Sequence, residues 1–206
     1  MKSRKLFKVC ALLMLAVMSC LLFSGCGGQS EQKKFVITYL PNESTDKNAD
    51  ARKGMAGDLS KVLGMEVTEL VSNDYNAVIE AMRTGKADMA YFGPLSFCLA
   101  YERAGAQPIG MIAKDKDKKN ATYKSVLVTS SKNTDINSIQ DIKGKTMAFV
   151  DPNSTSGNLI PSAAIMKAFP GEKLSMDDLH TNGKFFQAVS FSGKHQAGLA
   201  AVVKGD

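Results

Sequence analysis

Short β-branched runs alternate with helical patterns along the first half of the chain, and this order restricts the fold more than any other feature. Runs rich in valine, isoleucine and aromatic residues predict strands, and apolar residues repeated on one helical face predict helices. The predicted strands are 34–40, 65–72, 87–93 and 107–114, and the predicted helices between them are 49–63, 74–85 and 94–105. This order is typical of an α/β unit with a largely parallel sheet.

The same alternation returns in the second half of the chain. The elements predicted there are a strand over 124–130, a short helix or turn from 138, a strand ending at Asp151, a helix after 158, a strand over 184–193 and a helix over 194–205. We therefore expect two similar α/β lobes, 35–128 and 129–206. Two such lobes predict a ligand cleft between them.

The first 25 residues have the pattern of a secretory signal rather than of a folded element. A basic head is followed by an apolar run over 9–23 and by the sequence Ser-Gly-Cys. The run is short for a membrane span, which needs about 20 residues. Cys26 after Ser-Gly resembles a bacterial lipobox, so we expect lipid on Cys26, a signal over 1–25 and a tether over 26–34. The alternative is an ordinary secretory signal with an incidental cysteine.

Charge and cysteine content exclude several functional classes. Cleavage before Cys26 removes four basic residues and no acidic ones, so the formal charge of +6 falls to +2 and does not indicate nucleic-acid binding. Cys98 is then the one unmodified cysteine, which argues against an intrachain disulfide and predicts a buried core thiol. Only two histidines occur, without metal-ligand spacing, and the charged loop at 114–123 lacks the glycine and glutamate of a calcium loop. We expect no metal and no cofactor.

The stretch DPNSTSGN, residues 151–158, places three consecutive hydroxyl side chains where a strand ends and a helix begins. A helix N-terminus presents unpaired amides and a partial positive charge, and hydroxyls add further donors. Such a turn can bind a tetrahedral oxyanion without a charged side chain. The alternative is a helix cap in which one serine satisfies the backbone and the other hydroxyls are solvated. The stretch matches neither the phosphate loop of nucleotide-binding proteins nor the dinucleotide-binding fingerprint.

Three stretches resemble successive signatures of one family: NDYNAVIEAMRTGKADMAYFGPLSF, DIKGKTMAFVDPNSTSGNLIPSA and FSGKHQAGLAAVVKGD. They are similar to the phosphonate-, phosphate- and phosphite-binding lipoproteins of ABC importers, which have a type II periplasmic-binding-protein fold. The resemblance runs from about Phe35 to the last residue. It implies an α/β fold of two lobes around a cleft.

The resemblance also implies a set of ligand-binding residues. The family's pocket corresponds here to the hydroxyls of the DPNSTSGN turn, two tyrosines and one histidine: Ser154, Thr155, Ser156, Tyr75, Tyr123 and His195. Each assignment has a structural alternative: a surface aromatic for Tyr75, loop packing for Tyr123 and a helix cap for His195. Tyr91 is expected in the core or in the pocket wall.

The family usually continues for about another hundred residues, so the resemblance predicts a truncated chain with an incomplete second lobe. The acidic residues that hold a substrate's amino group in aminoalkylphosphonate binders would belong to that part. Amine selectivity is therefore left open.

The sequence leads to three functional hypotheses. The first is a substrate-binding component that captures a phosphonate, phosphite or phosphate oxyanion and delivers it to an ABC permease, lipid-anchored outside the cytoplasm. The second is a Ser/His hydrolase of phosphate esters using Ser154 or Ser156 with His195, although no Gly-x-Ser-x-Gly elbow is present. The third is a non-transport sensor or a non-functional truncated fragment.

Overall fold

The computed structural model describes residues 33–42, 46–113 and 115–205. The predicted signal, Cys26 and nearly all of the tether lie outside these residues. From Lys34 onward the chain belongs to one compact unit, which contains two parallel sheets. Among the described residues, no helix is both long and apolar enough to cross a membrane.

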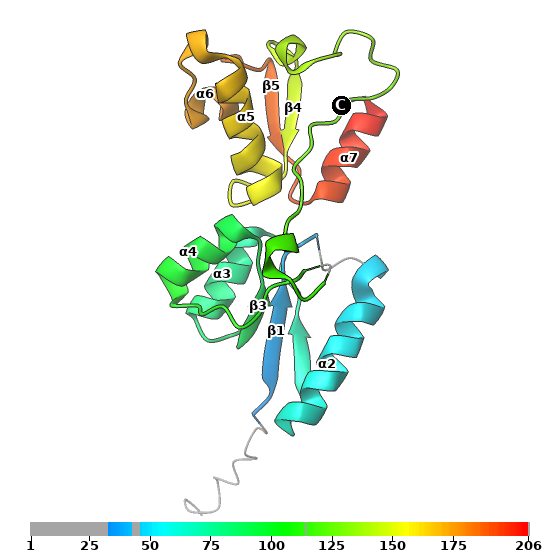
Figure 1. Cartoon of the computed structure of the whole chain (residues 1–206), viewed down its shortest axis with the longest axis vertical. Coiled ribbons are helices and arrows are strands. Elements are labelled where there is room, and N and C mark those ends of the chain that lie inside the picture. The colour runs from blue at the N-terminus through cyan, green and yellow to red at the C-terminus, as the bar shows by residue number, and fades with distance from the viewer. Residues whose placement is uncertain (1–32, 43–45, 114, 206) are drawn as a thin grey trace, which may run out of the picture. The chain divides into compact units, whose positions relative to one another are not determined.

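The first sheet has the strand order β2-β1-β3 and is wholly parallel. Its strands are β1 (Phe35–Tyr39), β2 (Val67–Leu70) and β3 (Met89–Tyr91). The connecting helices are α2 (Ala49–Leu63), α3 (Tyr75–Arg83) and α4 (Pro94–Ala104), and Figure 1 shows α2 on one side of this sheet with α3 and α4 on the other. The structure confirms the three strands and three helices predicted between residues 34 and 105, and the parallel pairing of the strands.

Helix ends in this half follow from local sequence. Asp74 caps α3 by accepting a hydrogen bond from Ala77 N at 2.7 Å, and Pro94 occupies the first turn of α4, where its missing N–H is harmless. Gly105 ends α4 in the left-handed conformation, with φ 64°.

The second sheet consists of β4 (Thr146–Phe149) and β5 (Ala188–Phe191), again parallel. A five-residue π-helix, η4 (Thr155–Leu159), follows β4 and continues into α5 (Ile160–Ala168). The short α6 (Met176–His180) precedes β5, and α7 (His195–Lys204) follows it. In Figure 1, α5 and α6 lie on one side of this sheet and α7 on the other.

The core beneath the second sheet is aromatic and aliphatic. Its buried members, drawn from β4, α5, α6 and the segment before β5, are Phe149, Ile165, Leu179, Phe185 and Phe186. A second buried cluster brings Tyr75 and Val78 of α3 against Leu40 and Val150, which follow β1 and β4. The carboxyl ends of two strands from different sheets therefore share a core with the start of α3.

Two predicted strands are wrong. The structure has irregular chain over 107–113 and 124–130, and none of the described strands pairs with either segment. Their apolar side chains are exposed, as in Ile109 at 81% and Val126 at 71%. A β-prone pattern becomes a strand only where a neighbouring strand accepts its hydrogen bonds, so the pattern alone was misleading.

Two further differences concern helices. Cys98 is exposed rather than buried, because α4 buries the face that carries Ser96 and Ala100, and a residue midway between them points away from that face. Helix α6 was not predicted, although Ser175 and Asp178 form a capping box that marks its start.

Candidate functional site

The DPNSTSGN stretch forms a tight turn that leads from β4 into η4. Asp151 begins the turn, since its carbonyl accepts from Ser154 N at 2.9 Å and its carboxylate accepts from Asn153 N at 2.8 Å. Ser154, only 1% exposed, caps η4 by accepting from Gly157 N at 3.0 Å. Gly157 packs so closely that an added Cβ would lie 2.3 Å from Val150 Cγ2.

Each of the three consecutive hydroxyls faces a different helix. Ser154 Oγ lies 3.5 Å from the hydroxyl of Tyr75 at the start of α3, and Thr155 Oγ1 accepts from Leu95 N of α4 at 2.8 Å. Ser156 Oγ lies 3.2 Å from His195 Nε2 at the start of α7. Ser154 does act as the helix cap, but the hydroxyls of Thr155 and Ser156 have protein partners. The alternative of a cap with solvated neighbouring hydroxyls is therefore excluded.

Tyr75 is buried at 3% exposure, which excludes the surface-aromatic alternative. Its hydroxyl accepts a hydrogen bond from Asn42 Nδ2 and faces Ser154. Burial raises the pKa of Tyr75, while its hydrogen bonds with Ser154 and Asn42 act to lower that pKa. The phenol therefore stays protonated near neutral pH and can act as a donor.

His195 is the first residue of α7, and its side chain is exposed. Gly193, at φ 76°, turns the chain out of β5 and donates to Val150 O at 2.7 Å, which keeps the start of α7 beside the DPNSTSGN turn. The imidazole meets Ser156, and the backbone N–H of His195 donates to Asn42 Oδ1 at 2.8 Å.

Tyr123 is 59% exposed, but its hydroxyl lies near the same turn. A Cβ built on Gly93 would be 3.8 Å from Tyr123 Oη and 3.4 Å from Thr155 Oγ1. The structure thus brings all six predicted residues around one turn.

Three neighbouring residues were missed by the sequence analysis. Asn42 bonds to both Tyr75 and His195, Ser125 Oγ donates to Ser156 O at 2.7 Å, and Asp151 is buried beneath the turn. Burial raises the pKa of the Asp151 carboxyl, and the backbone N–H groups of Asn153 and Tyr75 act to lower it.

A positional rule could have found two of these residues. In parallel α/β sheets, ligands bind beyond the carboxyl ends of the strands. Asn42 comes shortly after β1, and Asp151 comes shortly after β4. Polar residues at those positions are therefore candidate ligand-binding residues.

The chemistry of the turn suits a tetrahedral oxyanion. The donors are hydroxyls, an imidazole and the first amides of η4, which have no partner within their own helix. No group of three or more potential metal ligands occurs among the described residues. The 3.2 Å separation of Ser156 and His195 also fits a nucleophile–base pair.

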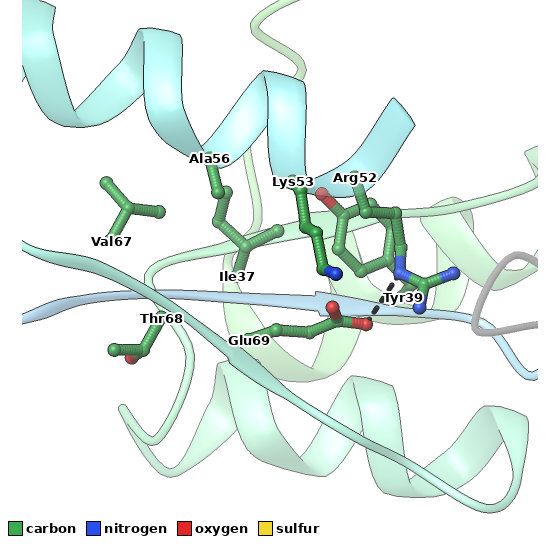
Figure 2. A pocket seen from close by; sticks show the side chains of 8 residues that line it. All are labelled: Ile37, Tyr39, Arg52, Lys53, Ala56, Val67, Thr68 and Glu69. Atoms are coloured by element: carbon green, nitrogen blue, oxygen red, sulfur yellow. Dashed lines mark ion pairs between the residues drawn. The ribbon is translucent and has the colours of Figure 1, made fainter. Parts of the chain in front are cut away.

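A pocket of about 190 Å³ lies elsewhere, between α2 and the first sheet (Figure 2). None of the six predicted residues lines it. Arg52 Nε is 2.8 Å from Glu69 Oε1 there, and the guanidinium lies 5.8 Å from the ring centre of Tyr39. Because its arginine is already paired with a carboxylate, this pocket is a poor candidate for an anion site.

Comparison with known proteins decides the family. A family model described as ABC transporter, phosphonate, periplasmic substrate-binding protein matches residues 37–206. The chain belongs to this family. The phosphate-import protein PhnD of Mycolicibacterium smegmatis is 29% identical over 196 residues, covering 90% of this chain and 60% of the relative. A probable phosphite-binding ABC transporter protein, PhnD1 of Prochlorococcus marinus, is 31% identical over 207 residues, covering 98% of this chain and 63% of the relative.

A solved structure extends the comparison to the fold. The binding-protein component of an ABC phosphonate transporter from Pseudomonas aeruginosa superposes with a TM-score of 0.68 at 25% identity, over 85% of this chain and 55% of that one. The expected α/β, type II periplasmic-binding-protein-like fold is confirmed. The chain spans less than two thirds of the length of each of these relatives.

Proposed function

We propose that the chain is the substrate-binding component of an ABC importer and captures a phosphonate, phosphite or phosphate oxyanion for delivery to a membrane permease. The family match supports this role, and relatives named for phosphate, phosphite and phosphonate support the ligand class. One observation carries the proposal: three consecutive hydroxyls at a helix start contact two side chains and one backbone amide from three other helices.

The proposed ligand contacts are the six residues around the turn: Ser154, Thr155, Ser156, Tyr75, Tyr123 and His195. Neutral donors can hold a charged ligand without a permanent counter-charge, because the partial positive charges of several hydrogen-bond donors together stabilise the anion. A carrier that must release its ligand benefits from this arrangement. Tyr75 and Tyr123 precede residue 129 whereas the hydroxyl turn and His195 follow it, so ligand binding would join the proposed lobes 35–128 and 129–206.

The proposed location is the outer face of a bacterial cell membrane. The basic head, the apolar run and Cys26 support a cleaved signal followed by a lipid anchor. Mass spectrometry of the membrane fraction tests this point, and an unmodified Cys26 would contradict it.

Isothermal titration calorimetry of the chain with methylphosphonate, phosphite and phosphate tests the proposed function. Thr155→Ala should weaken binding by about 1–3 kcal/mol, since it leaves Leu95 N and a bound oxygen each without a partner. Thr155→Ser should retain most of the affinity, and the exposed Thr134→Ala should bind as the parent does. Unchanged affinity in Thr155→Ala would refute the assigned pocket, and absence of binding of all three anions would refute the function.

The spacing of Ser156 and His195 keeps a phosphate-ester hydrolase as the second candidate. Under the binding-protein proposal, incubation with an aryl phosphate gives no product. Turnover that Ser156→Ala abolishes would establish the hydrolase instead.

A further inference from the structure

Asn42 joins two of the proposed ligand residues, although neither the sequence nor the family match singles it out. It comes three residues after β1 ends, and its side chain is half-buried. One end of its amide contacts the hydroxyl of Tyr75, and the other contacts the backbone of His195. The backbone carbonyl oxygen of Asn42 also accepts from Gln196 Nε2 at 3.3 Å.

The backbone of α7 fixes the orientation of the Asn42 amide. The N–H of His195 can only donate, so the atom that faces it at 2.8 Å must be the amide oxygen. The NH₂ group of Asn42 therefore points at Tyr75, and it can only donate there.

This orientation determines where the phenolic proton of Tyr75 goes. The oxygen of Tyr75 accepts from Asn42, so its single proton is directed toward Ser154 Oγ, at 3.5 Å. Ser154 Oγ already accepts from Gly157 N at 3.0 Å. A serine oxygen that accepts twice still has its own proton to donate. The hydrogen bonds thus run in one direction, from His195 N through Asn42 and Tyr75 to Ser154.

We propose that Asn42 is a positioning residue, which orients this series of hydrogen bonds so that Tyr75 and Ser154 present protons, not lone pairs, to the bound anion. The inference rests on the proposed oxyanion-binding function. The hydroxyls of Tyr75 and Ser154 lie at the long end of hydrogen-bond distances, so Tyr75 can redirect its hydrogen bond to a better acceptor at little cost. An inverted Asn42 would instead leave lone pairs facing an anion, which is repulsive.

The first test needs no ligand. The ionisation of Tyr75 is followed by phenolate absorbance, with Tyr75→Phe used to assign its step among the five tyrosines. Asn42→Asp keeps the side-chain shape and an acceptor for His195 N, but it replaces the donor to Tyr75 by a carboxylate oxygen. Asn42→Leu keeps the size and removes both functions. Both variants should raise the pKa of Tyr75, because Asn42 acts to lower it.

Asn76→Leu is the matched control, since Asn76 adjoins Tyr75 in the chain but bonds to Arg103 instead. It should leave the pKa of Tyr75 unchanged. An unchanged pKa in both Asn42 variants, with thermal melts showing that they fold, would overturn the inference.

The second test is a double-mutant cycle on methylphosphonate affinity. Asn42→Leu should raise Kd on the order of tenfold in the parent chain, the effect of about one charge-assisted hydrogen bond. The same substitution should have a clearly smaller effect when Tyr75→Phe is already present, because no phenolic proton remains to be directed. If Asn42→Leu raises Kd by the same factor with and without Tyr75→Phe, the inference is overturned, while oxyanion binding itself is not. If the parent chain binds no anion, the proposed function fails, and the ionisation test alone decides the orientation of Tyr75.

Discussion

Gly157→Ala is the substitution that probes the hydroxyl turn most sharply without removing any polar group. A methyl group at this position would lie 2.3 Å from Val150 Cγ2, 2.4 Å from Val150 Cβ and 3.0 Å from Ser154 Oγ. Rotation of the valine side chain does not relieve the contact with Cβ, so the backbone has to move. That movement also strains the hydrogen bond from Val150 N to Gly157 O, now 3.0 Å long.

The magnitude follows from the cost of overpacking a buried site. Inserting a methyl group into a well-packed region typically costs about 1–3 kcal/mol. For a domain of this size that loss corresponds to a melting temperature lower by about 2–12 °C. Methylphosphonate affinity should fall as well, because the strained backbone carries Ser154 and the first amides of η4.

Gly54→Ala is the matched control. Gly54 also lies in a helix, α2, but a Cβ there would meet no atom within 4 Å. Alanine should stabilise this exposed helix by about 0.5–1 kcal/mol and leave anion affinity unchanged. Thermal melts and calorimetry of both variants measure the contrast. A Gly157→Ala chain that melts and binds like its parent would show that the turn is not packed as described.

Two other predictions concern residues outside the turn. Burial lowers the pKa of His180, so the unfolded chain takes up a proton first as pH falls. The contribution of neutral His180 to the free energy of unfolding should be fully present above the ordinary histidine pKa of about 6.5 and should decline below it. Urea unfolding at neutral and mildly acidic pH measures how the free energy of unfolding changes with pH, and His180→Gln should reduce that change. An equally large change in the variant would assign the pH dependence to other groups. Because Cys98 is exposed, a thiol reagent should label it in the native protein, and Cys98→Ser should remove that signal. Labelling of Cys98 that requires denaturant would restore the buried-thiol prediction.

The first sheet could be predicted from the sequence because its signals are local. The run FVITY, the cap Asp74 and Pro94 at the start of α4 each specify their element without distant help. The segments 107–113 and 124–130 show the limit of that reasoning. Their patterns are as β-prone as that of β1, but strand formation depends on a partner that no local pattern supplies.

The candidate site divides in the same way. The three hydroxyls were visible as a cluster, and the family resemblance supplied the tyrosines and His195. Asn42 was missed because its importance lies in two contacts, to Tyr75 and to His195, that span 33 and 153 positions of the chain. Only the folded structure brings those partners together.

The measurement that tests the central claim most directly is an amide NMR titration of the chain with methylphosphonate. If the anion binds at the hydroxyl turn, the amide signals of Thr155 and Ser156 should shift most, because these two residues begin η4 and their N–H groups would contact the bound oxygens. The amides of Arg52 and Lys53, in the pocket beside α2, should stay in place. Shifts at Arg52 and Lys53 with none at Thr155 and Ser156 would contradict the account.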